Sequence, residues 1–321
     1  MADTLTTLAE LILFNSQDVN PAEITDILNM SPALARMHAM QSSNGTVHKY
    51  NKETTAPVVG FRAVNDGADY TAGSSTQISV TLKYMDAKVI EDSAECRAYR
   101  FGAEAWMDHR TMRQLRQALY VLEKQIWYGT IHGDASGFSG IANDANYNGA
   151  SDGQVVNAGG TTAGTGSSVF LVASTPDDAA FALVGAGDSG ISAPNINFTI
   201  SPTFQTAVLG ANSKTMVANV RDAGAHLGVQ VGSKYAVVRI ANLTADSGKG
   251  LTDALLADAM GKFPSGMKPT MICCSRRSLT QLRKSRTTYN PTGQYATLPQ
   301  DFDAVPIIPT DSIIDTETLL A

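Results

Sequence analysis

A glycine-rich motif at residues 185–190 is the first place in this sequence where residue types and spacing could support chemistry. Gly185-Ala186-Gly187-Asp188-Ser189-Gly190 has the spacing of a dinucleotide-binding turn. That chemistry requires a helix immediately afterwards, so that the helix N-terminus faces the pyrophosphate. The segment that follows is ISAPNIN, which contains Pro194, and no acidic residue stands about twenty positions further on. We interpret the motif as a glycine-rich turn.

A serine motif and a histidine cluster are the remaining catalytic candidates. Gly149-Ala150-Ser151-Asp152-Gly153 has nucleophile-elbow spacing, but the flanking ANDANYN and QVVNAGG supply neither the buried strand nor the helix that an elbow needs. The five histidines show no paired metal-ligand spacing. His132, Asp134 and Ser136 are close in sequence, yet nothing orients them. We therefore predict no catalytic residue, no metal and no cofactor.

Composition narrows the class of protein. The chain has 321 residues and a net charge of -6, and its mean hydropathy of -0.07 is typical of a globular protein of one to three domains. The acidic balance gives no overall basic footprint for nucleic-acid recognition. Cys96, Cys273 and Cys274 are too few and too poorly spaced for a disulfide framework or a zinc site, which favours a reducing cytoplasm. We identify no signal peptide and no membrane-spanning run.

A long amphipathic helix is predicted at residues 108–128. Apolar residues recur at spacings of three and four, which places them on one stripe that should face a core. The stripe consists of Met112, Leu115, Leu119, Leu122 and Ile126. Asp108 is expected to cap the helix, and Gly129 to end it in a left-handed conformation. Arg110, Arg113 and Arg116 lie on the opposite side, where a solvated or salt-bridged face and a phosphate-contacting face are the two interpretations.

Residues 46–95 change to a period of two, which predicts a long hairpin. Ile78, Val80, Leu82 and Tyr84 share one face, and residues 65–76 (NDGADYTAGSST) predict its tip. A two-stranded ribbon is marginal alone in water, so we expect its apolar face to be covered by another subunit. Residues 1–45 contain short helical patterns that also need an external surface, and we interpret them as an arm.

The remaining sequence predicts a mixed body. Strands are expected at residues 168–173, 181–184, 197–200, 215–220, 229–243, 270–274 and 304–308. Helices are expected at residues 251–260 and after Ser275. Strands and helices alternate without βαβ regularity, so the predicted fold class is α+β.

Three stretches of this body resemble a known family when they are taken in order. They are residues 228–243 (GVQVGSKYAVVRIANL), 269–284 (PTMICCSRRSLTQLRK) and 302–311 (FDAVPIIPTD). Together with the arm, the hairpin and the long helix, they resemble the major capsid proteins of tailed bacteriophages, which share the Hong Kong 97-type (HK97) shell fold. Strands between residues 168 and 243 precede the Pro-Thr strand, so the resemblance implies a permuted strand order.

The resemblance implies a structural protein without catalysis. It implies pentamers and hexamers that close into an icosahedral shell around double-stranded DNA, so the protein would be located in the virion and assembled in the host cytoplasm. Expected partners are other copies, a separate scaffolding protein, a portal, a cement protein and non-specifically packaged DNA, with no membrane. Arg110, Arg113 and Arg116 would face DNA or a neighbouring subunit.

The resemblance also divides the chain. Residues 1–45 would be the arm and 46–95 the extended loop. A peripheral domain would take 96–145 and 205–246, with the spine helix at 108–128, and an axial domain 146–204 and 247–321. Extended-loop contacts to another subunit are expected from Phe61, Asn65, Asp66, Tyr70, Ile78, Val80, Leu82 and Tyr84.

Two alternatives remain open from the sequence. An encapsulin-like compartment would keep the fold and enclose a cargo protein, so the contents of purified shells separate it from a capsid. A nucleotide-binding enzyme would use residues 185–190 and should bind a dinucleotide.

Overall fold

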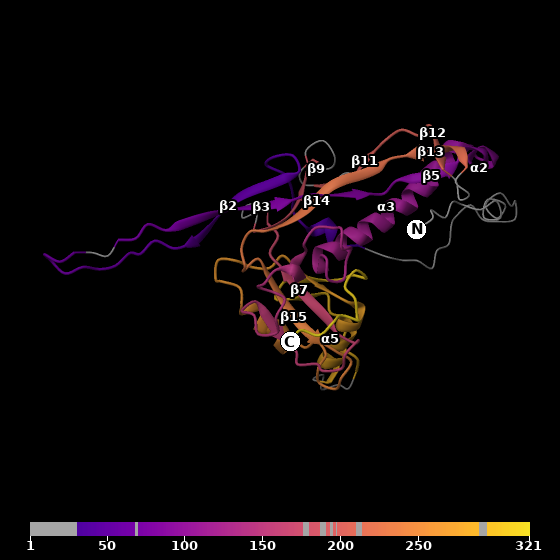
Figure 1. The fold of residues 1–321 in the computed structure, drawn as a ribbon. Helices are drawn as coiled ribbons and strands as arrows, with labels where there is room; N and C mark the ends of the chain where they lie inside the picture. The colour runs from indigo at the N-terminus through magenta and orange to yellow at the C-terminus, as the bar shows by residue number, and fades with distance from the viewer. Residues whose placement is uncertain are drawn as a thin grey trace.

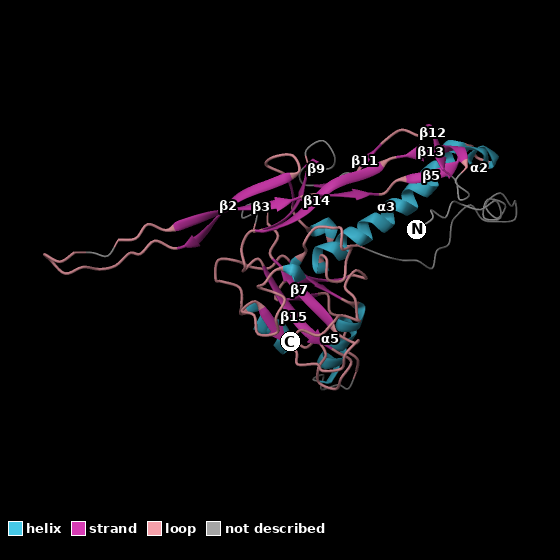
Figure 2. Cartoon of the chain, in the orientation of Figure 1, coloured by secondary structure: helices cyan, strands magenta, loops and turns pink. Residues whose placement is uncertain are grey.

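The computed structural model describes residues 31–67, 70–175, 180–186, 191–192, 195–196, 198–209, 214–288 and 294–321. Most of the expected N-terminal arm and residues 187–190 of the glycine-rich motif lie outside these ranges. Two sheet-containing regions are joined by one long helix, and a narrow two-stranded ribbon projects from the upper region (Figure 1). The helices and strands are mixed as Figure 2 shows, and the predicted α+β class is confirmed.

The lower region is built on a six-stranded sheet with the order β17-β18-β16-β7-β15-β6. Its strands are β6 (Val155–Asn157), β7 (Ser167–Val172), β15 (Val237–Leu243), β16 (Met271–Cys274), β17 (Asp301–Phe302) and β18 (Val305–Pro309). The central strands β7, β15 and β16 are buried along their whole length, and their sequences are mostly apolar, with Arg239 of β15 as a buried exception. Helices α4 (Asp253–Met260) and α5 (Arg276–Thr288) pack against this sheet through Leu256, Leu279 and Leu282. Ser275 caps α5 as predicted, since its Oγ accepts from Ser278 N at 3.2 Å.

The upper region contains two further sheets. In the larger one, β1 (Ala39–Gln41), β8 (Phe181–Gly185), β14 (Ala223–Val231) and β11 (Thr199–Ile200) follow one another, and β4 (Lys83–Asp86) also pairs with β14. The smaller one has the order β12 (Phe204–Leu209), β13 (Thr215–Arg221) and β5 (Val89–Asp92). The short helix α2 (Ser93–Ala98) follows β5 directly, with Asp92 as its cap. A small hairpin, β9 (Ile191–Ser192) with β10 (Asn195–Ile196), completes the strand pairing in this region.

The long helix α3 (Ala103–Tyr128) spans 26 residues, or about 39 Å at 1.5 Å per residue. It begins five residues before the expected start, because Gly102 has a φ of +94° and turns the chain into the helix. Asp108 is therefore not the cap; its carboxylate lies 2.5 Å from Arg221 Nη1. Gly129 ends the helix as predicted, and its φ of +52° requires glycine, but its ψ of -132° differs from the left-handed helical conformation that was expected.

The C-terminal half of α3 lies at the junction of the two regions. Trp127 and Tyr128 are fully buried and contact Phe170 of β7, with ring centroids 5.1 and 6.3 Å apart. The same hydrophobic cluster includes Phe181 of β8 and Leu227 of β14 from the upper region. Short 3-10 turns, η1 (Leu34–Arg36) and η2 (Ile141–Asn143), flank this cluster. One core thus holds both regions on a single helix.

Strand pairing corrects three expected boundaries. The segment 229–243 is not one strand, because the chain turns at residues 232–236 and β14 and β15 then join different sheets. β15 joins the six-stranded lower sheet although its residues fall within the expected peripheral segment 205–246, and β8 joins the upper sheet although its residues fall within the expected axial segment 146–204. The hairpin also ends before residue 95, because β4 and β5 pair with β14 and β13. Pairing across distant segments, which sequence periodicity does not encode, determines these boundaries.

Candidate assembly surfaces

The projecting ribbon consists of β2 (Val47–Thr55) and β3 (Ser74–Thr81). The two strands are antiparallel, with His48 opposite Val80 and Tyr50 opposite Ile78. Beyond residue 55 the ribbon continues as two extended segments that bridge once, at Val58 and Thr71. Figure 1 shows that this distal part leaves the body of the subunit entirely.

The root of the ribbon is fixed by hydrogen bonds to the end of β14. His48 Nε2 lies 2.7 Å from Gln230 Oε1, and His48 Nδ1 accepts from Ser43 N at 3.1 Å. Because Nδ1 accepts, the neutral ring carries its proton on Nε2 and donates it to Gln230. Tyr50 Oη also donates to the Val231 carbonyl at 3.2 Å. The ribbon is therefore anchored at its base and unsupported at its end.

The expected apolar face of the ribbon is partly covered inside the subunit, which corrects one prediction. Leu82 is only 4% exposed and packs against Val184 and Ala186. Tyr84 is 54% exposed and lies on β4, with its ring 4.9 Å from that of His226. Strand β4 follows β3 along the chain and pairs with β14. Strand β14 therefore covers the base of the ribbon, although no third strand lies within residues 46–95. Ile78 and Val80 are half-buried, so only the distal residues stay open.

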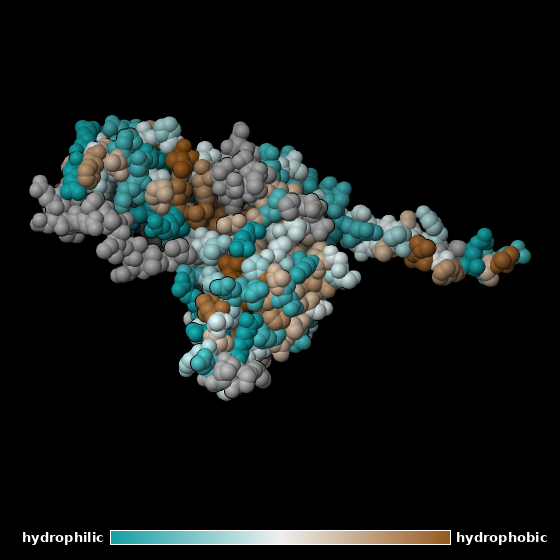
Figure 3. Space-filling model, turned by 180° about the vertical axis from the view of Figure 1, so that it is seen from behind, coloured by the Kyte–Doolittle hydropathy of each residue, from teal (hydrophilic) through white to brown (hydrophobic). Residues whose placement is uncertain are grey.

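The tip carries the apolar side chains that nothing in the described part of the subunit covers. Val59, Phe61, Val64 and Tyr70 are almost wholly exposed. A tight turn closes the tip, with Asp66 N donating to the Ala63 carbonyl at 3.2 Å and Asn65 at a φ of +71°. Figure 3 shows brown side chains along the far end of the ribbon. Contact of Phe61, Asn65, Asp66 and Tyr70 with another subunit stays a prediction.

The expected core stripe of α3 is correct at its C-terminal end and wrong at its N-terminal end. Leu122 and Ile126 are at most 1% exposed, and Leu115 and Leu119 are half-buried. Met112 is 63% exposed. Within the described residues, the first half of α3 packs mainly against the narrow sheet of β5 and β13 and against helix α2, and Trp106 and Met107 take the buried side there. The sequence analysis missed both because they precede the predicted start of the helix.

The expected basic face is also narrower than predicted. Arg110 Nε donates to Glu91 Oε1 at 2.7 Å, and its guanidinium lies 5.7 Å from the centre of the Trp106 ring. It therefore belongs to an internal ion pair and not to an outer surface. Arg113 and Arg116 are exposed, and their contact with DNA or another subunit remains a prediction.

A buried carboxylate ties the two ends of the chain to α3. Glu123 accepts hydrogen bonds from the Ala33 and Leu34 amides at 3.1 and 3.3 Å. It also accepts from the Thr310 hydroxyl and from Ser312 Oγ, the latter at 2.6 Å. Burial raises the pKa of this carboxyl, and the four hydrogen bonds oppose that rise. The glutamate was not among the predicted site residues, since a charged residue on a helix is usually solvent-exposed.

A second buried polar group holds the C-terminal segment. Arg239 of β15 forms an ion pair with Glu317, and both side chains are at most 4% exposed. Arg239 Nη1 also donates to the Tyr147 carbonyl at 2.8 Å, and Ser168 Oγ bonds to both charged groups at 3.0 Å. Burial lowers the pKa of the Arg239 guanidinium to about 10, so it stays charged at neutral pH. These contacts order residues 310–321 against the sheet.

The catalytic candidates are separated or occupied. His132 Nε2 accepts from Thr318 N at 3.4 Å, and Asp134 Oδ1 accepts from Ser136 N at 2.8 Å, so the cluster forms loop contacts. Ser151 lies in an irregular turn, with no strand-to-helix elbow around it. Among the described residues, no group of three or more His, Cys, Asp or Glu side chains could hold a metal. No helix in the described part of the chain is long and apolar enough to cross a membrane.

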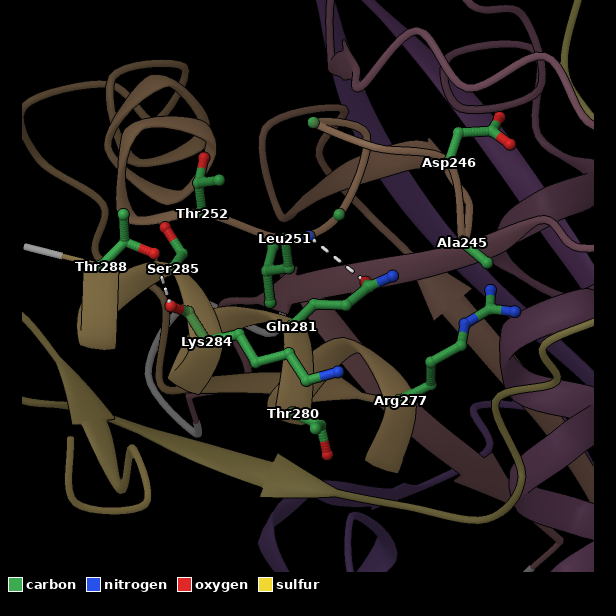
Figure 4. A pocket seen from close by; sticks show the side chains of 12 residues that line it. Ala245, Asp246, Leu251, Thr252, Arg277, Thr280, Gln281, Lys284, Ser285 and Thr288 are labelled. Carbon is green, nitrogen blue, oxygen red and sulfur yellow. Dashed lines mark hydrogen bonds between the residues drawn. The ribbon is translucent and has the colours of Figure 1, made fainter. Parts of the chain in front are cut away.

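A polar groove of about 510 Å³ lies between α5 and the loop at residues 245–252 (Figure 4). Gln281 fastens the loop, since its Oε1 accepts from Leu251 N at 3.3 Å. Lys284 borders the groove, whereas Arg277 donates to the carbonyls of Thr165 and Asp315. Hydrogen bonds from the Thr162 and Thr244 hydroxyls lower the pKa of Asp246 to about 2, so this carboxylate is ionised at neutral pH.

A second cavity of about 310 Å³ lies at the root of the ribbon. Its floor is apolar and buried, formed by Leu122, Phe138 and Leu227. The rim is exposed and mostly polar. It includes Lys83, Tyr84, Asp86, Asp134 and Ser136. The cavity therefore combines an apolar interior with charged edges.

The long helix, the projecting ribbon and the two sheet-containing regions define a shell-forming protein of the HK97-like class. A solved structure of bacteriophage Epsilon15 aligns with a TM-score of 0.73 at 16% identity, over 100% of this chain and 98% of that chain. The bacteriophage JBD30 capsid aligns with a TM-score of 0.50 at 13% identity, over 96% and 99% of the two chains. A comparison with curated protein sequences gave no match.

The family follows from the sequence itself. The model of the family described as "Major capsid protein GP7" matches residues 16–321. The chain belongs to this family and is a major capsid protein of a tailed phage. Its copies associate with one another in the capsid, and the protein is a component of the virion. The resemblance inferred from the sequence is thereby confirmed.

Proposed function

We propose that copies of this chain form pentamers and hexamers that close into an icosahedral shell around double-stranded DNA. In this proposal the ribbon is a strap that lies across a neighbouring subunit. The observation that carries it is the contrast between the anchored root, at His48 and Tyr50, and the uncovered tip at Val59, Phe61, Val64 and Tyr70.

The energetics favour burial of the tip between subunits. Burying four such side chains is worth roughly 6–12 kcal/mol before the costs of association, at about 1.5–3 kcal/mol each. A monomer gains nothing from these residues, because large apolar side chains in water are a solubility liability. Their gathering at one end of the ribbon therefore supports an inter-subunit role.

The proposal assigns the other expected parts as follows. Arg113 and Arg116 contact DNA or a neighbouring subunit, and the contacts to DNA are non-specific and sensitive to salt. The protein has no catalytic role, needs no cofactor and assembles in the host cytoplasm. A separate scaffolding protein, a portal and a cement protein complete the particle.

Strand pairing supports a revised division of the chain. We assign residues 47–81 to the extended loop and the rest of the segment up to residue 95 to a peripheral domain. That domain also takes α3, β8 and β11 to β14, which pair above the helix. The axial domain takes the six-stranded sheet with α4 and α5. Because η1 packs on the subunit core and β1 belongs to the larger upper sheet, we limit the arm to the residues before η1.

Shortening the ribbon tests the strap. Residues 56–73 are replaced by a short Gly-Ser turn, which keeps β2, β3 and the root contacts. We expect a soluble subunit that melts cooperatively, because the removed residues contribute nothing to the described core. Closed shells should not form when this subunit is expressed with its scaffold, as measured by sedimentation and electron microscopy.

A matched control keeps the whole tip and changes charges on the proximal ribbon, with Lys49→Ser and Glu53→Ser in the full-length ribbon. This control should form closed shells. Normal shells from the shortened chain would refute the strap, and a shortened chain that fails to fold would place the ribbon in the subunit core. DNA inside the wild-type shells supports a capsid, whereas a packaged protein cargo would favour the encapsulin-like alternative.

A further inference from the structure

We propose that the cavity at the root of the ribbon receives the ribbon tip of a second copy, with Phe61 as the inserted side chain. This inference rests on the proposed strap function and names the surface on which the strap ends. The tip and the cavity lie at opposite ends of the ribbon, so no subunit can fill its own cavity with its own tip (Figure 1).

The composition of the cavity matches an apolar side chain. Leu122, Phe138 and Leu227 form a buried floor, and Tyr84 on the rim is 54% exposed. An inserted aromatic ring would lie against this apolar floor and would cover the exposed face of Tyr84.

The charges beside the two surfaces are complementary. Arg62 follows Phe61 on the tip, and its guanidinium donates only to the Asp66 carbonyl at 3.0 Å within the described residues. Asp86 and Asp134 stand on the rim, and in the described part of the chain neither carboxylate has an ion-pair partner within 4.0 Å. Insertion of Phe61 would bring Arg62 to these carboxylates. Charge pairs of this kind set orientation and encounter rate more than affinity.

The length of the ribbon fits a contact with the next copy. About 18 extended residues separate Lys83 at the root from Asn65 at the tip, a span of roughly 60 Å. A compact body of this chain length has a diameter of roughly 50 Å. The tip therefore reaches past the near edge of a neighbour to the position of that neighbour's root. A tip-to-root contact joins two different surfaces and is therefore heterologous. Repeated from copy to copy, such a contact generates a ring when the rotation between neighbours returns to the first copy.

Cross-linking of assembled shells tests the contact without removing Phe61. Cysteine is introduced by Gly60→Cys beside the inserted ring and by Ser136→Cys on the rim. Gly60 has no atom within 4 Å of an added Cβ, Ser136 is exposed, and the three native cysteines are buried. Shells carrying both substitutions are treated with a short bis-maleimide and separated on a denaturing gel. We expect a ladder from dimers to whole capsomers, and none from unassembled subunits.

The control pair is Gly60→Cys with Val217→Cys, because Val217 on β13 is 52% exposed at the far end of the upper region. Intact shells without a ladder from the Gly60 and Ser136 pair would overturn the cavity assignment and leave the strap function standing. A ladder from the control pair alone would move the contact to β13. If the double variant does not assemble, co-assembly of the two single variants should give a cross-linked dimer, and its absence overturns the proposal equally.

A second measurement asks whether tip and rim are coupled. Phe61→Ala and Tyr84→Ala should each raise the subunit concentration needed for assembly, Phe61→Ala by about tenfold or more. The double variant should require no more than the worse single variant, because both remove one contact. If the increase in the required subunit concentration for the double variant equals the product of the two single increases, Phe61 and Tyr84 act at different places, and the inference would be overturned.

Discussion

Replacing Glu123 by alanine removes the acceptor of four hydrogen bonds that join three distant segments. The backbone amides of Ala33 and Leu34 would lose the carboxylate to which they donate, whereas Thr310 and Ser312 can still bond to each other across 3.0 Å. An unsatisfied buried donor costs about 1–3 kcal/mol, so the two amides alone predict a loss of roughly 2–6 kcal/mol in the free energy of unfolding. Glu123→Gln keeps one oxygen and the side-chain volume, so it should cost about 1 kcal/mol at acidic pH.

The effect of pH on this site has a definite sign. Burial raises the pKa of Glu123 above its ordinary value of 4.5, so the folded state holds this proton more tightly than the unfolded state. The contribution of Glu123 to stability is therefore full below pH 4.5 and decreases as pH rises through the folded-state pKa. Each unit of pKa elevation lowers it by about 1.4 kcal/mol. Glu123→Gln lacks this dependence, so its deficit relative to wild type should shrink or reverse towards neutral pH.

Urea denaturation of unassembled subunits between pH 4 and pH 8 measures the difference between wild type and Glu123→Gln. Other carboxyls titrate equally in both proteins and cancel from that difference. Glu53→Gln, on the exposed strand β2, is the matched control and should give a difference that is small at every pH. A wild-type advantage over Glu123→Gln that grows as pH rises would show that hydrogen bonding outweighs burial, and the reasoning would be refuted.

Two further predictions concern α3. Leu122→Ala should cost about 2–5 kcal/mol because it opens a cavity in a core where Leu122 is 1% exposed, whereas Met112→Ala at a 63% exposed position should change subunit stability by about 0.5 kcal/mol or less. Equal melting shifts for these two variants would contradict the assigned helix faces. Gly129→Ala should cost more than about 1 kcal/mol, because the residue has a φ of +52° and a Cβ there would overlap Asn143 Oδ1 and the Gly140 amide. Thermal unfolding followed by circular dichroism tests this, and a melting temperature that matches the wild type would refute the account of the helix end.

The sequence predicted the elements that depend on local periodicity. The apolar spacing around Leu122 and Ile126, the turn residue Gly129 and the cap Ser275 each act within one or two turns of chain, so they can be recognised without a fold. The tip of the ribbon was located only in part: the turn at residues 63–66 overlaps the start of the predicted tip 65–76, whereas residues 74–76 belong to β3. Local signals of this kind are independent of what packs against them.

The errors have a common physical cause, because each depends on a partner distant in sequence. Leu82 was predicted to be open because β14, which follows it by about 140 residues, could not be identified as its neighbour. Arg110 was assigned to an outer face because its partner Glu91 lies before a change of chain direction. Met112 satisfied the helical spacing, yet the spacing gives only the direction of a side chain and not the presence of a surface to meet it.

A few buried charged groups and a few exposed apolar groups depart from the usual pattern in this chain, and the two sets have separate roles. Glu123 and Arg239 lie inside the subunit, where the full set of partners exists in only one arrangement of the helix, the sheet and the C-terminal segment. Such groups add little net stability, but any other arrangement leaves them unpaired, so they favour one docking of the two regions. Phe61 and the other apolar residues of the tip are exposed, so they do not favour one arrangement of the monomer over another. Because the two sets share no contact, variants in the first should change subunit stability, variants in the second should change assembly, and their effects should add.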